Sequence, residues 1–525
     1  MTQLRHYFLW LLLAALLAAC EAAPAPIAPS EAAPTPAILT IVILHTNDIH
    51  GYVEPERVKL PDGKEIETGG LANLAGTIDQ TRKDYHGNVL LLDAGDVWRG
   101  TFLSNRTNGE LLLTAMNISA YDAVAPGNHD FDDGQDVLKA RVQQAKFPWI
   151  AANLVDVSTN QAPFGMKPYL VKQVAGVRFG IIGLTNPATP IINKPGNVKG
   201  LQFLPGPEGV RRVYDEVRKQ SDIIVVLSHL GIDGDGLLAQ TVGGIDIIVG
   251  GHSHTQQINA RLVNHTIVTQ AGSNARFLGR LALSIDPATK KITSAATQNE
   301  LLTITNAKYP ANSEIADLVK NRLDAVRATV NRPIGETAED LIRAYTPDGR
   351  TSGEYPLGNL VMDAMLAANQ AGDRPADIAL HNNAGLRADI AKGPITYGKL
   401  YEVLPFDNVL TAMDLNGAQI KQVLEQAVSC PRVNILVAGM SFAYDCAKPS
   451  GGRVSDILIR EQALDAQKIY RLQTIDYLAG GGDGQTTFRD GTNLVYGDLV
   501  VDVVAAYVTT HSPLHVQNEG RIRAR

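Results

Sequence analysis

The segment Gly250-Gly251-His252-Ser253-His254 constrains the fold more than any other in this chain of 525 residues. It directly follows the mainly apolar run 245–249, whose length and bounding glycines are typical of a buried strand. Two imidazoles therefore leave one strand end on a backbone that glycine allows to bend freely. Such a pair indicates a site that gathers ligands from several strands, and it predicts that other buried strands also end in His, Asp or Asn.

Four further apolar runs meet this prediction, because each leads directly into polar residues that can bind a metal. The run 39–44 precedes Asp48 and His50, 89–92 precedes Asp96, 123–125 precedes Asn128, and 223–227 precedes His229. Helical patterns separate several of these runs, which favours an α/β fold. In open α/β sheets, ligands collect at the carboxyl ends of the strands. The five strand ends are therefore expected to meet in one site.

The candidate ligands are oxygen and imidazole donors without cysteine: Asp48, His50, Asp96, Asn128, His229, His252 and His254. This donor set suits Zn, Mn, Fe or Co. Seven ligands exceed the needs of one tetrahedral ion but fit two ions about 3.5–4 Å apart, with Asp96 as the expected bridge. A two-metal site of this kind points to phosphoester hydrolysis. A single strand-end Asp or buried His is usually structural, and His45 is expected to be so.

Next to Asn128 lies a candidate acid–base group. On an extended backbone the side chains of Asn128 and His129 would point apart, which leaves His129 free for the substrate. Asp132, three residues on, could orient its imidazole. We therefore expect His129 to stabilise the phosphoryl transition state or to protonate the leaving oxygen.

The N-terminus is typical of an exported protein. After Arg5, the apolar run 7–19 is too short to span a bilayer and fits a signal peptide. Leu17-Ala18-Ala19-Cys20 resembles the bacterial lipobox, so residues 1–19 are predicted to be removed and Cys20 to carry the lipid that anchors the chain to a membrane. The alternative is an ordinary secretory signal beside a cysteine. The Ala- and Pro-rich stretch 20–38 would serve as a tether.

Two cysteines remain in the exported chain, Cys430 and Cys446. In an oxidising compartment one leftover pair suggests a disulfide. The alternative is two buried thiols, because the sequence does not give the distance between them. The net charge of −7 argues mildly against nucleic-acid binding.

The chain divides near residue 312. An amphipathic helix over 313–331 follows the i, i+3, i+4 apolar pattern and is expected to connect two domains. The first domain, 39–312, contains all five strand ends that carry candidate metal ligands. The second, 332–525, has a different pattern of short strands, helices and glycine-rich turns.

The strand-end motifs resemble those of the calcineurin-like metallophosphoesterases, and their arrangement with the second domain resembles the bacterial 5′-nucleotidase/UDP-sugar hydrolase family. The motifs are Asn47-Asp48-Ile49-His50-Gly51, Gly95-Asp96, Gly127-Asn128-His129-Asp130-Phe131-Asp132, Ser228-His229-Leu230-Gly231 and Gly250-Gly251-His252-Ser253-His254. The resemblance covers residues 39–525. It implies an α/β fold with a four-layer metallophosphoesterase sandwich, followed by a second α/β domain that recognises nucleotides. It also implies that the domains rotate to bring substrate to the metals.

The resemblance assigns roles to these residues. Asp48, His50, Asp96 and His254 would hold one metal; Asp96, Asn128, His229 and His252 would hold the other. His129 and Asp132 match the catalytic dyad of the family. Relatives often have Gln where this chain has His254, which can alter metal preference.

In the second domain the resemblance points to a nucleoside site. Phe406 and Tyr477 fall where two aromatic rings stack on the base, and Asp483 matches the residue that holds the ribose hydroxyls. Asn382 and Arg387 match an Asn-x-x-x-x-Arg element near the base and the phosphate. An upstream arginine of the family is replaced by Thr351 here, and the neighbouring Arg350 is the candidate to take its place.

The sequence therefore predicts an exported, lipid-anchored hydrolase at the cell envelope. A metal-bound hydroxide would release phosphate from nucleoside 5′-monophosphates, with two divalent ions (Zn, Mn or Co) as cofactors. Alternatives are hydrolysis of UDP-sugars or of 2′,3′-cyclic nucleotides, or a surface lipoprotein that binds nucleotides without turnover. No nucleic acid or protein partner is implied. Metal identity, base preference and oligomeric state stay open.

Overall fold

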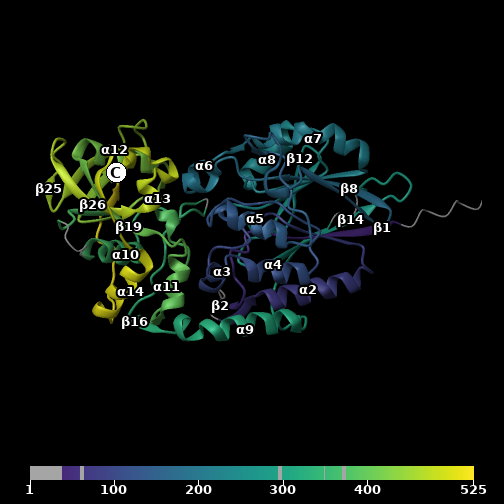
Figure 1. Cartoon of the computed structure of the whole chain (residues 1–525), viewed down its shortest axis with the longest axis horizontal. Coiled ribbons are helices and arrows are strands. Elements are labelled where there is room, and N and C mark those ends of the chain that lie inside the picture. Colours follow the sequence, from purple (N-terminus) through teal and green to yellow (C-terminus); the bar gives the residue numbers. More distant parts are fainter. Residues whose placement is uncertain (1–37, 60–63, 294–297, 348, 369–373) are drawn as a thin grey trace, which may run out of the picture.

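The computed structural model describes residues 38–59, 64–293, 298–347, 349–368 and 374–525. The predicted signal peptide 1–19, Cys20 and all of the predicted tether 20–38 except Ile38 lie outside this part of the chain. Among the described residues no helix combines the length and the apolar character needed to cross a membrane. Figure 1 shows two lobes side by side, with α9 (Ser313–Val330) along the base of the first lobe and reaching toward the second.

The first lobe contains two sheets. The first has the order β15 (Gln298–Thr303), β14 (Phe277–Ile285), β1 (Leu39–Thr46), β4 (Val89–Asp93), β5 (Ala123–Val124). The second has the order β12 (Arg261–Val263), β13 (Thr266–Gln270), β11 (Ile247–Gly250), β10 (Ile223–Ser228), β8 (Val177–Leu184), β7 (Tyr169–Val174). The five strands with metal-type ends are β1, β4 and β5 in one sheet and β10 and β11 in the other. Within each sheet these strands are parallel, so their carboxyl ends share one edge.

Successive side chains of each strand point to opposite faces of its sheet, and this alternation separates the hydrophobic cores of the first lobe. Ile41 and Ile43 of β1 pack in a core with Val225 of β10 and Val249 of β11, which places this core between the sheets. Val42 and the other alternate residues pack in a separate core with the helices α2 (Leu71–Asp84) and α4 (Glu110–Ile118). A third core joins the second sheet to α7 (Gly206–Gln220) and α8 (Ile232–Thr241). The order helix, sheet, sheet, helix confirms the predicted four-layer sandwich.

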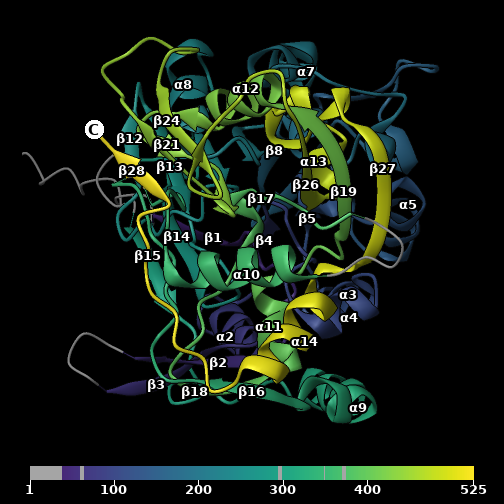
Figure 2. The ribbon, with the colours of Figure 1, turned by 90° about the vertical axis from the view of Figure 1, so that its left-hand side faces the viewer.

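The second lobe is also α/β, as predicted. Its main sheet has the order β22 (Leu436–Ala438), β17 (Ile378–His381), β26 (Ile469–Ile475), β19 (Val409–Asn416), β27 (Thr492–Leu499). Figure 2 shows β17, β26, β19 and β27 following one another across this lobe. The helices α10 (Pro356–Ala367), α12 (Gly417–Ala427) and α14 (Val500–His511) contribute buried apolar residues to the same core as the sheet.

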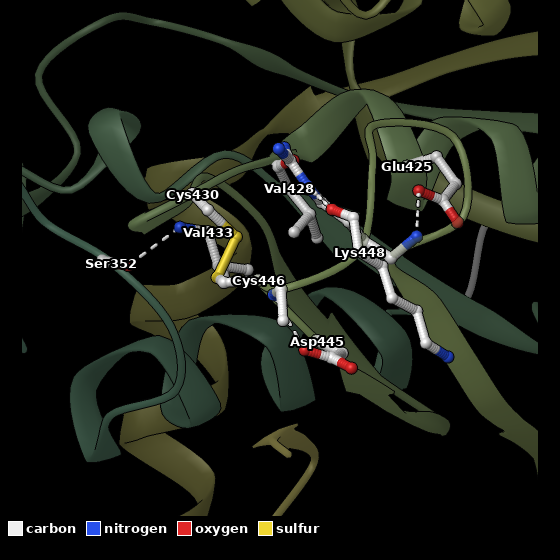
Figure 3. Close-up of a disulfide and its surroundings, with 10 residues drawn as sticks. Ser352, Glu425, Val428, Cys430, Val433, Asp445, Cys446 and Lys448 are labelled. Atoms are coloured by element: carbon white, nitrogen blue, oxygen red, sulfur yellow. Dashed lines mark hydrogen bonds between the residues drawn. A yellow bond between two sulfur atoms is a disulfide. The ribbon is translucent and has the colours of Figure 1, made fainter.

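A disulfide joins Cys430 to Cys446, as the sequence suggested (Figure 3). It ties the hairpin of β20 (Val428–Ser429) and β21 (Arg432–Val433) to the segment that follows β23 (Met440–Tyr444). The backbone N–H of Val433 donates to the hydroxyl of Ser352 at 2.9 Å, which anchors the same hairpin on its other side.

From the sequence alone, the apolar segments 263–270 and 279–285 are each expected to form one strand at an edge or in the second sheet, and the structure differs from this expectation in detail. The predicted strand 263–270 is two antiparallel strands, because Asn264 and His265 form a turn with φ values of +45° and +73°. The segment 279–285 was expected at an edge or in the second sheet. It belongs instead to β14, which lies between β1 and β15 inside the first sheet. In both places the tertiary partner, rather than the local pattern, decides the pairing.

Candidate metal centre and adjoining cavity

The five strand-end loops bring six of the seven predicted ligands into two adjacent groups. Asp48, His50 and His254 form one group, and Asp96, His229 and His252 form the other; within each, one ligand atom per residue lies within 4.8 Å of the others. The Nε2 atoms of His50 and His254 face each other at 3.0 Å. Both groups therefore have the spacing of atoms that share a cation.

Asp96 lies between the two groups. Its Oδ2 atom is 3.2 Å from Nε2 of His229 and 3.8 Å from Nε2 of His50. Its Oδ1 atom accepts the backbone N–H of His129 at 2.7 Å. One carboxylate thus reaches both ligand groups and the loop of the predicted dyad, which is the position that a bridging ligand requires.

The backbone of this centre is strained where the ligands lie. Five predicted ligands have left-handed φ values: Asp48 (+52°), His50 (+50°), Asp96 (+56°), His252 (+76°) and His254 (+54°). Non-glycine residues rarely adopt this region, and such outliers cluster at functional sites. Gly127 is needed for a different reason, because a Cβ at this position would collide with the carboxylate of Asp96.

Backbone carbonyls orient the histidines. Nδ1 of His50 donates to the carbonyl of Arg99 at 3.1 Å, and Nδ1 of His229 donates to the carbonyl of Ala94 at 2.6 Å. This arrangement leaves each Nε2 lone pair directed at the cluster, as metal-binding histidines require. Nε2 of His229 and Oδ1 of Asn128 are buried and have no hydrogen-bond partner in the described structure. A divalent cation would satisfy both atoms.

The electrostatics of the centre also favour bound cations. Burial opposes ionisation of Asp48, yet the neighbouring His254 and His229 lower its pKa to about 2. Burial disfavours a charge on His229, yet Asp96 raises its pKa to about 10. Burial, reinforced by His229, lowers the pKa of His252 to about 4. The centre thus holds ionised carboxylates that stabilise a proton on His229, and a divalent cation would take the place of that proton, so the donor set fits divalent metals.

The predicted dyad is formed, but not on the expected backbone. Asn128 and His129 are helical rather than extended, since His129 begins a short 3₁₀ turn (His129–Phe131). Nδ1 of His129 lies 2.7 Å from Oδ2 of Asp132. The other carboxylate oxygen of Asp132 accepts from Nδ2 of Asn193 at 2.6 Å, and Asn193 also donates to the carbonyl of Asn128. Asn193 therefore fixes the dyad to the metal loop.

The second lobe reaches into this centre through Arg387. Its guanidinium nitrogens lie 3.4 Å from Nε2 of His129 and 3.4 Å from Nε2 of His50. The guanidinium carbon is 5.7 Å from the centre of the Phe406 ring, and that ring stacks on His129 with 5.4 Å between centroids. Arg387 thus places a cation beside the dyad and the metal ligands, where a substrate phosphate would bind.

Asp483 organises the other end of the site. Its carboxylate accepts from Nδ2 of Asn382 at 2.7 Å, from Nδ2 of Asn434 at 2.8 Å and from the hydroxyl of Tyr477 at 2.7 Å. Asp483 has a φ of +54° in a glycine-rich turn, so its carboxylate is positioned by a strained backbone as well as by donors. Three predicted substrate residues are therefore linked in one network.

One cavity joins the two halves of the site. Its lining includes Asn128, His129, Asp132 and His252 from the first lobe and Asn382, Arg387, Phe406, Tyr477 and Asp483 from the second. Arg350 is the predicted substrate residue that the structure does not bring there: it is exposed and does not line the cavity. Arg432, on the disulfide-tied hairpin, lines it instead. His45 is buried and belongs to neither ligand group.

The sequence did not single out several positioning residues. Nδ2 of Asn47 donates to the carboxylate of Asp48, and its Oδ1 accepts the backbone N–H of Ala271. Asp130 accepts the backbone N–H groups of Asp96, Val97 and Gly127. Both residues lie within the strand-end motifs, so their place in the sequence could have identified them as positioning residues. Asn193 and Asn434 carry no such signal, because each is an isolated amide in a loop.

Comparison with known proteins agrees with this geometry. Residues 41–256 match the calcineurin-like phosphoesterase family, and residues 333–490 match the 5′-nucleotidase C-terminal domain. Each domain match covers one of the lobes described above.

The similarity extends over whole chains. A snake venom 5′-nucleotidase from Naja atra is 30% identical, with 92% of this chain and 98% of the relative covered. The trifunctional nucleotide phosphoesterase YfkN from Bacillus subtilis is 31% identical over 88% of this chain, which spans 33% of that longer protein. The crystal structure of a 5′-nucleotidase precursor from Thermus thermophilus matches with a TM-score of 0.84 and 33% identity, covering 92% of this chain and 99% of the other. The chain therefore belongs to the 5′-nucleotidase family and is a phosphoester hydrolase.

Proposed function

We propose that the protein hydrolyses nucleoside 5′-monophosphates to the nucleoside and phosphate. The observation that supports this most strongly is the shared cavity, which has the dyad and metal ligands of one lobe at one end and the rings of Phe406 and Tyr477 on the wall from the other lobe. A phosphate at the metal end and a base at the aromatic end would occupy both halves at once.

Two divalent ions would be held by the two groups around Asp48 and Asp96, with Asn128 as a further ligand of the second. When bound, they would supply Lewis-acid stabilisation of the phosphoryl charge and lower the pKa of a water. Arg387 would bind the phosphate oxygens through its fork of N–H donors. His129 is held by Asp132, which in turn is held by Asn193, and its Nε2 atom would donate a proton to the leaving 5′-oxygen.

The nucleoside would be recognised by the second lobe. Phe406 and Tyr477 offer flat apolar faces for a base, and stacking of this kind is worth about 1–3 kcal/mol per base. Asp483 is held between Asn382, Asn434 and Tyr477, and its carboxylate could still accept from ribose hydroxyls. Stacking tolerates any base, so this arrangement favours a broad base preference.

A wider range of phosphoesters is the second candidate, because the name of the Bacillus subtilis relative describes a trifunctional nucleotide phosphoesterase. The same metal centre would serve UDP-sugars or 2′,3′-cyclic nucleotides. Phosphate release from AMP, and product analysis with UDP-glucose and 2′,3′-cAMP, would separate these activities when the protein is loaded with Mn²⁺, Co²⁺ or Zn²⁺. If the metal-loaded protein released no phosphate from AMP, the leading proposal would be wrong. Calorimetric binding of AMP without turnover would identify a nucleotide-binding lipoprotein instead.

We also propose export and anchoring by a lipid on Cys20. Support comes from the signal-like run 7–19 with its lipobox-like end, and from the disulfide between Cys430 and Cys446, a bond that persists in oxidising compartments. Mass spectrometry of the protein from the membrane fraction should find a diacylglyceryl-modified Cys20 as the first residue. A soluble, unmodified mature chain would refute the anchor.

A further inference from the structure

Each aromatic ring of the proposed nucleoside site has an aspartate beside it in the sequence that pairs with the opposite lobe. Asp407 follows Phe406, and its Oδ2 atom lies 3.0 Å from Nη1 of Arg99. Asp476 precedes Tyr477, and its Oδ2 atom lies 2.9 Å from Nζ of Lys194. The two rings are thus flanked by two ion pairs that cross between the lobes, which we call the lobe-crossing pairs.

The Arg99 pair connects the metal loop to the turn that carries Phe406. The side chain of Arg99 is 8% exposed and also pairs with Asp133, while Nη1 donates to the carbonyl of Pro405 at 3.3 Å. Its backbone carbonyl is the acceptor that orients His50. One residue therefore touches a candidate metal ligand on one side and both neighbours of Phe406 on the other.

The Lys194 pair connects the dyad to the helix that carries Tyr477. Lys194 follows Asn193, whose side chain holds Asp132 and the carbonyl of Asn128. Oδ1 of Asp476 accepts the backbone N–H of Val409, which ties the start of α13 (Asp476–Ala479) to β19. The cation of this pair is more exposed than Arg99, with 39% of the Lys194 side chain accessible against 8%, whereas Asp476 is 19% accessible and Asp407 37%.

We propose that the two lobe-crossing pairs are positioning elements that set the distance between the nucleoside rings and the metal centre, and so determine the preference for nucleotides over smaller phosphate esters. The proposal rests on the proposed function. Its physical basis is that an error of about 1 Å in the placement of a substrate can cost ~10²-fold in rate. A substrate held at both ends of the cavity is the more sensitive to such an error, because an ester held only by its phosphate contacts the second lobe through Arg387 alone.

The two pairs should differ in strength because they differ in burial. Loss of Asp407 would leave the buried guanidinium of Arg99 with Asp133 as its remaining carboxylate partner, and this loss of compensation is unfavourable because the group is poorly solvated. An exposed pair contributes little. We therefore expect Asp407→Asn to affect nucleotide hydrolysis more than Asp476→Asn does.

The test compares AMP with glycerol 2-phosphate, an ester that has neither base nor ribose, using the full metal-loaded protein. Asp407→Asn should lower kcat/KM for AMP by at least ~10-fold and Asp476→Asn by about two- to fivefold. The loss of kcat/KM for glycerol 2-phosphate should be clearly smaller, and the metal content should stay at the wild-type value. Asp222→Asn is the matched control, because it removes an Arg–Asp pair, Arg178–Asp222 at 2.7 Å, between residues that do not line the cavity. Asp222→Asn should leave kcat/KM unchanged for both substrates.

The exposed pair allows a rescue that does not depend on the stability of the buried one. Lys194→Asp should impair AMP hydrolysis, because it brings two carboxylates together and places a negative charge in the cavity that Lys194 lines. Adding Asp476→Lys should restore part of the activity, since it re-forms the ion pair but removes the acceptor of the Val409 backbone N–H. Equal losses on both substrates, AMP kinetics unaffected by Asp407→Asn, or a double reversal that fails to recover would each overturn the proposal. A wild-type protein that hydrolyses glycerol 2-phosphate but not AMP would instead overturn the proposed function.

Discussion

The two halves of the cavity are built by different means. In the first lobe the ligands lie directly after buried parallel strands, and five of them have strained left-handed backbone conformations. In the second lobe the lining residues come from loops and short turns, such as Arg387, Phe406 and Asp483, and their side chains are held by one another. The sheet edges thus fix the chemistry in the first half, while loops whose side chains hold one another select the substrate in the second half.

The largest effect is expected from Asp96→Asn, which tests whether the first half carries the chemistry. The amide cannot bridge two cations, so metal content should fall and hydrolysis of both AMP and glycerol 2-phosphate should drop by at least ~10³-fold. Elemental analysis and phosphate release measure the two effects. Wild-type turnover by this variant would show that the chemistry lies elsewhere.

His129→Ala should have the next largest effect and should separate acid–base chemistry from metal binding. Turnover of both substrates should fall by about 10²-fold with the metal content unchanged, because His129 is expected to move a proton and not to hold a metal. His515→Ala is a suitable control, since this histidine is exposed and pairs only with Glu339 among the described residues. Loss of metal from His129→Ala would contradict the assigned role.

Phe406→Ala should affect only the half of the cavity that the second lobe forms, and it therefore tests whether the two halves act separately. Removal of one stacking face costs about 1–3 kcal/mol, which corresponds to a rise in KM for AMP of roughly 5- to 150-fold. Hydrolysis of glycerol 2-phosphate should be unchanged, because this ester has no base to stack. If both substrates lose activity equally, Phe406 acts on His129, on which it stacks, rather than on the base.

The smallest effect on turnover is expected from removal of the disulfide by Cys430→Ala with Cys446→Ala. The bond closes a loop with a sequence separation of 16, and loops of this size contribute about 3 kcal/mol of stability. Thermal unfolding should therefore begin at lower temperature. KM for AMP should rise modestly, since the hairpin carries Arg432 to the cavity and leads directly into Asn434, which donates to Asp483. Unchanged unfolding with unchanged KM would mean that the hairpin is held without the bond.

The same contrast explains what could be predicted from the sequence. Apolar runs that end in Asp, His or Asn identify strands and ligands together, so the α/β fold and the gathering of the ligands followed from the pattern. The four-layer arrangement followed from the family resemblance that these motifs carry. The helical turn at Asn128 and His129 did not, because a single sequence does not reveal the carbonyl and carboxylate partners that bend the loop. The amides Asn193 and Asn434 could not be singled out, since only the tertiary structure gives them partners.

The cationic residues show most clearly which features of the site could not be predicted from the sequence. Arg350 was the expected neighbour of the site by its place in the sequence, yet the cavity is lined by Arg432, which lies far along the chain on the disulfide-tied hairpin. Arg99 and Lys194 likewise form ion pairs with the opposite lobe that only the tertiary structure reveals. Long-range ion pairs of this kind leave no periodic or motif signal.

The division of labour between the lobes is the central claim, and calorimetric titration of nucleosides into the Asp96→Asn protein tests it most directly. Adenosine, guanosine, cytidine and uridine carry no phosphate, so their binding reports the second half alone. We predict that at least one of them binds to Asp96→Asn with the affinity of the wild type, and that Phe406→Ala weakens this binding by roughly 5- to 150-fold. Nucleoside binding that disappears together with the metals, while Phe406→Ala retains it, would contradict the account.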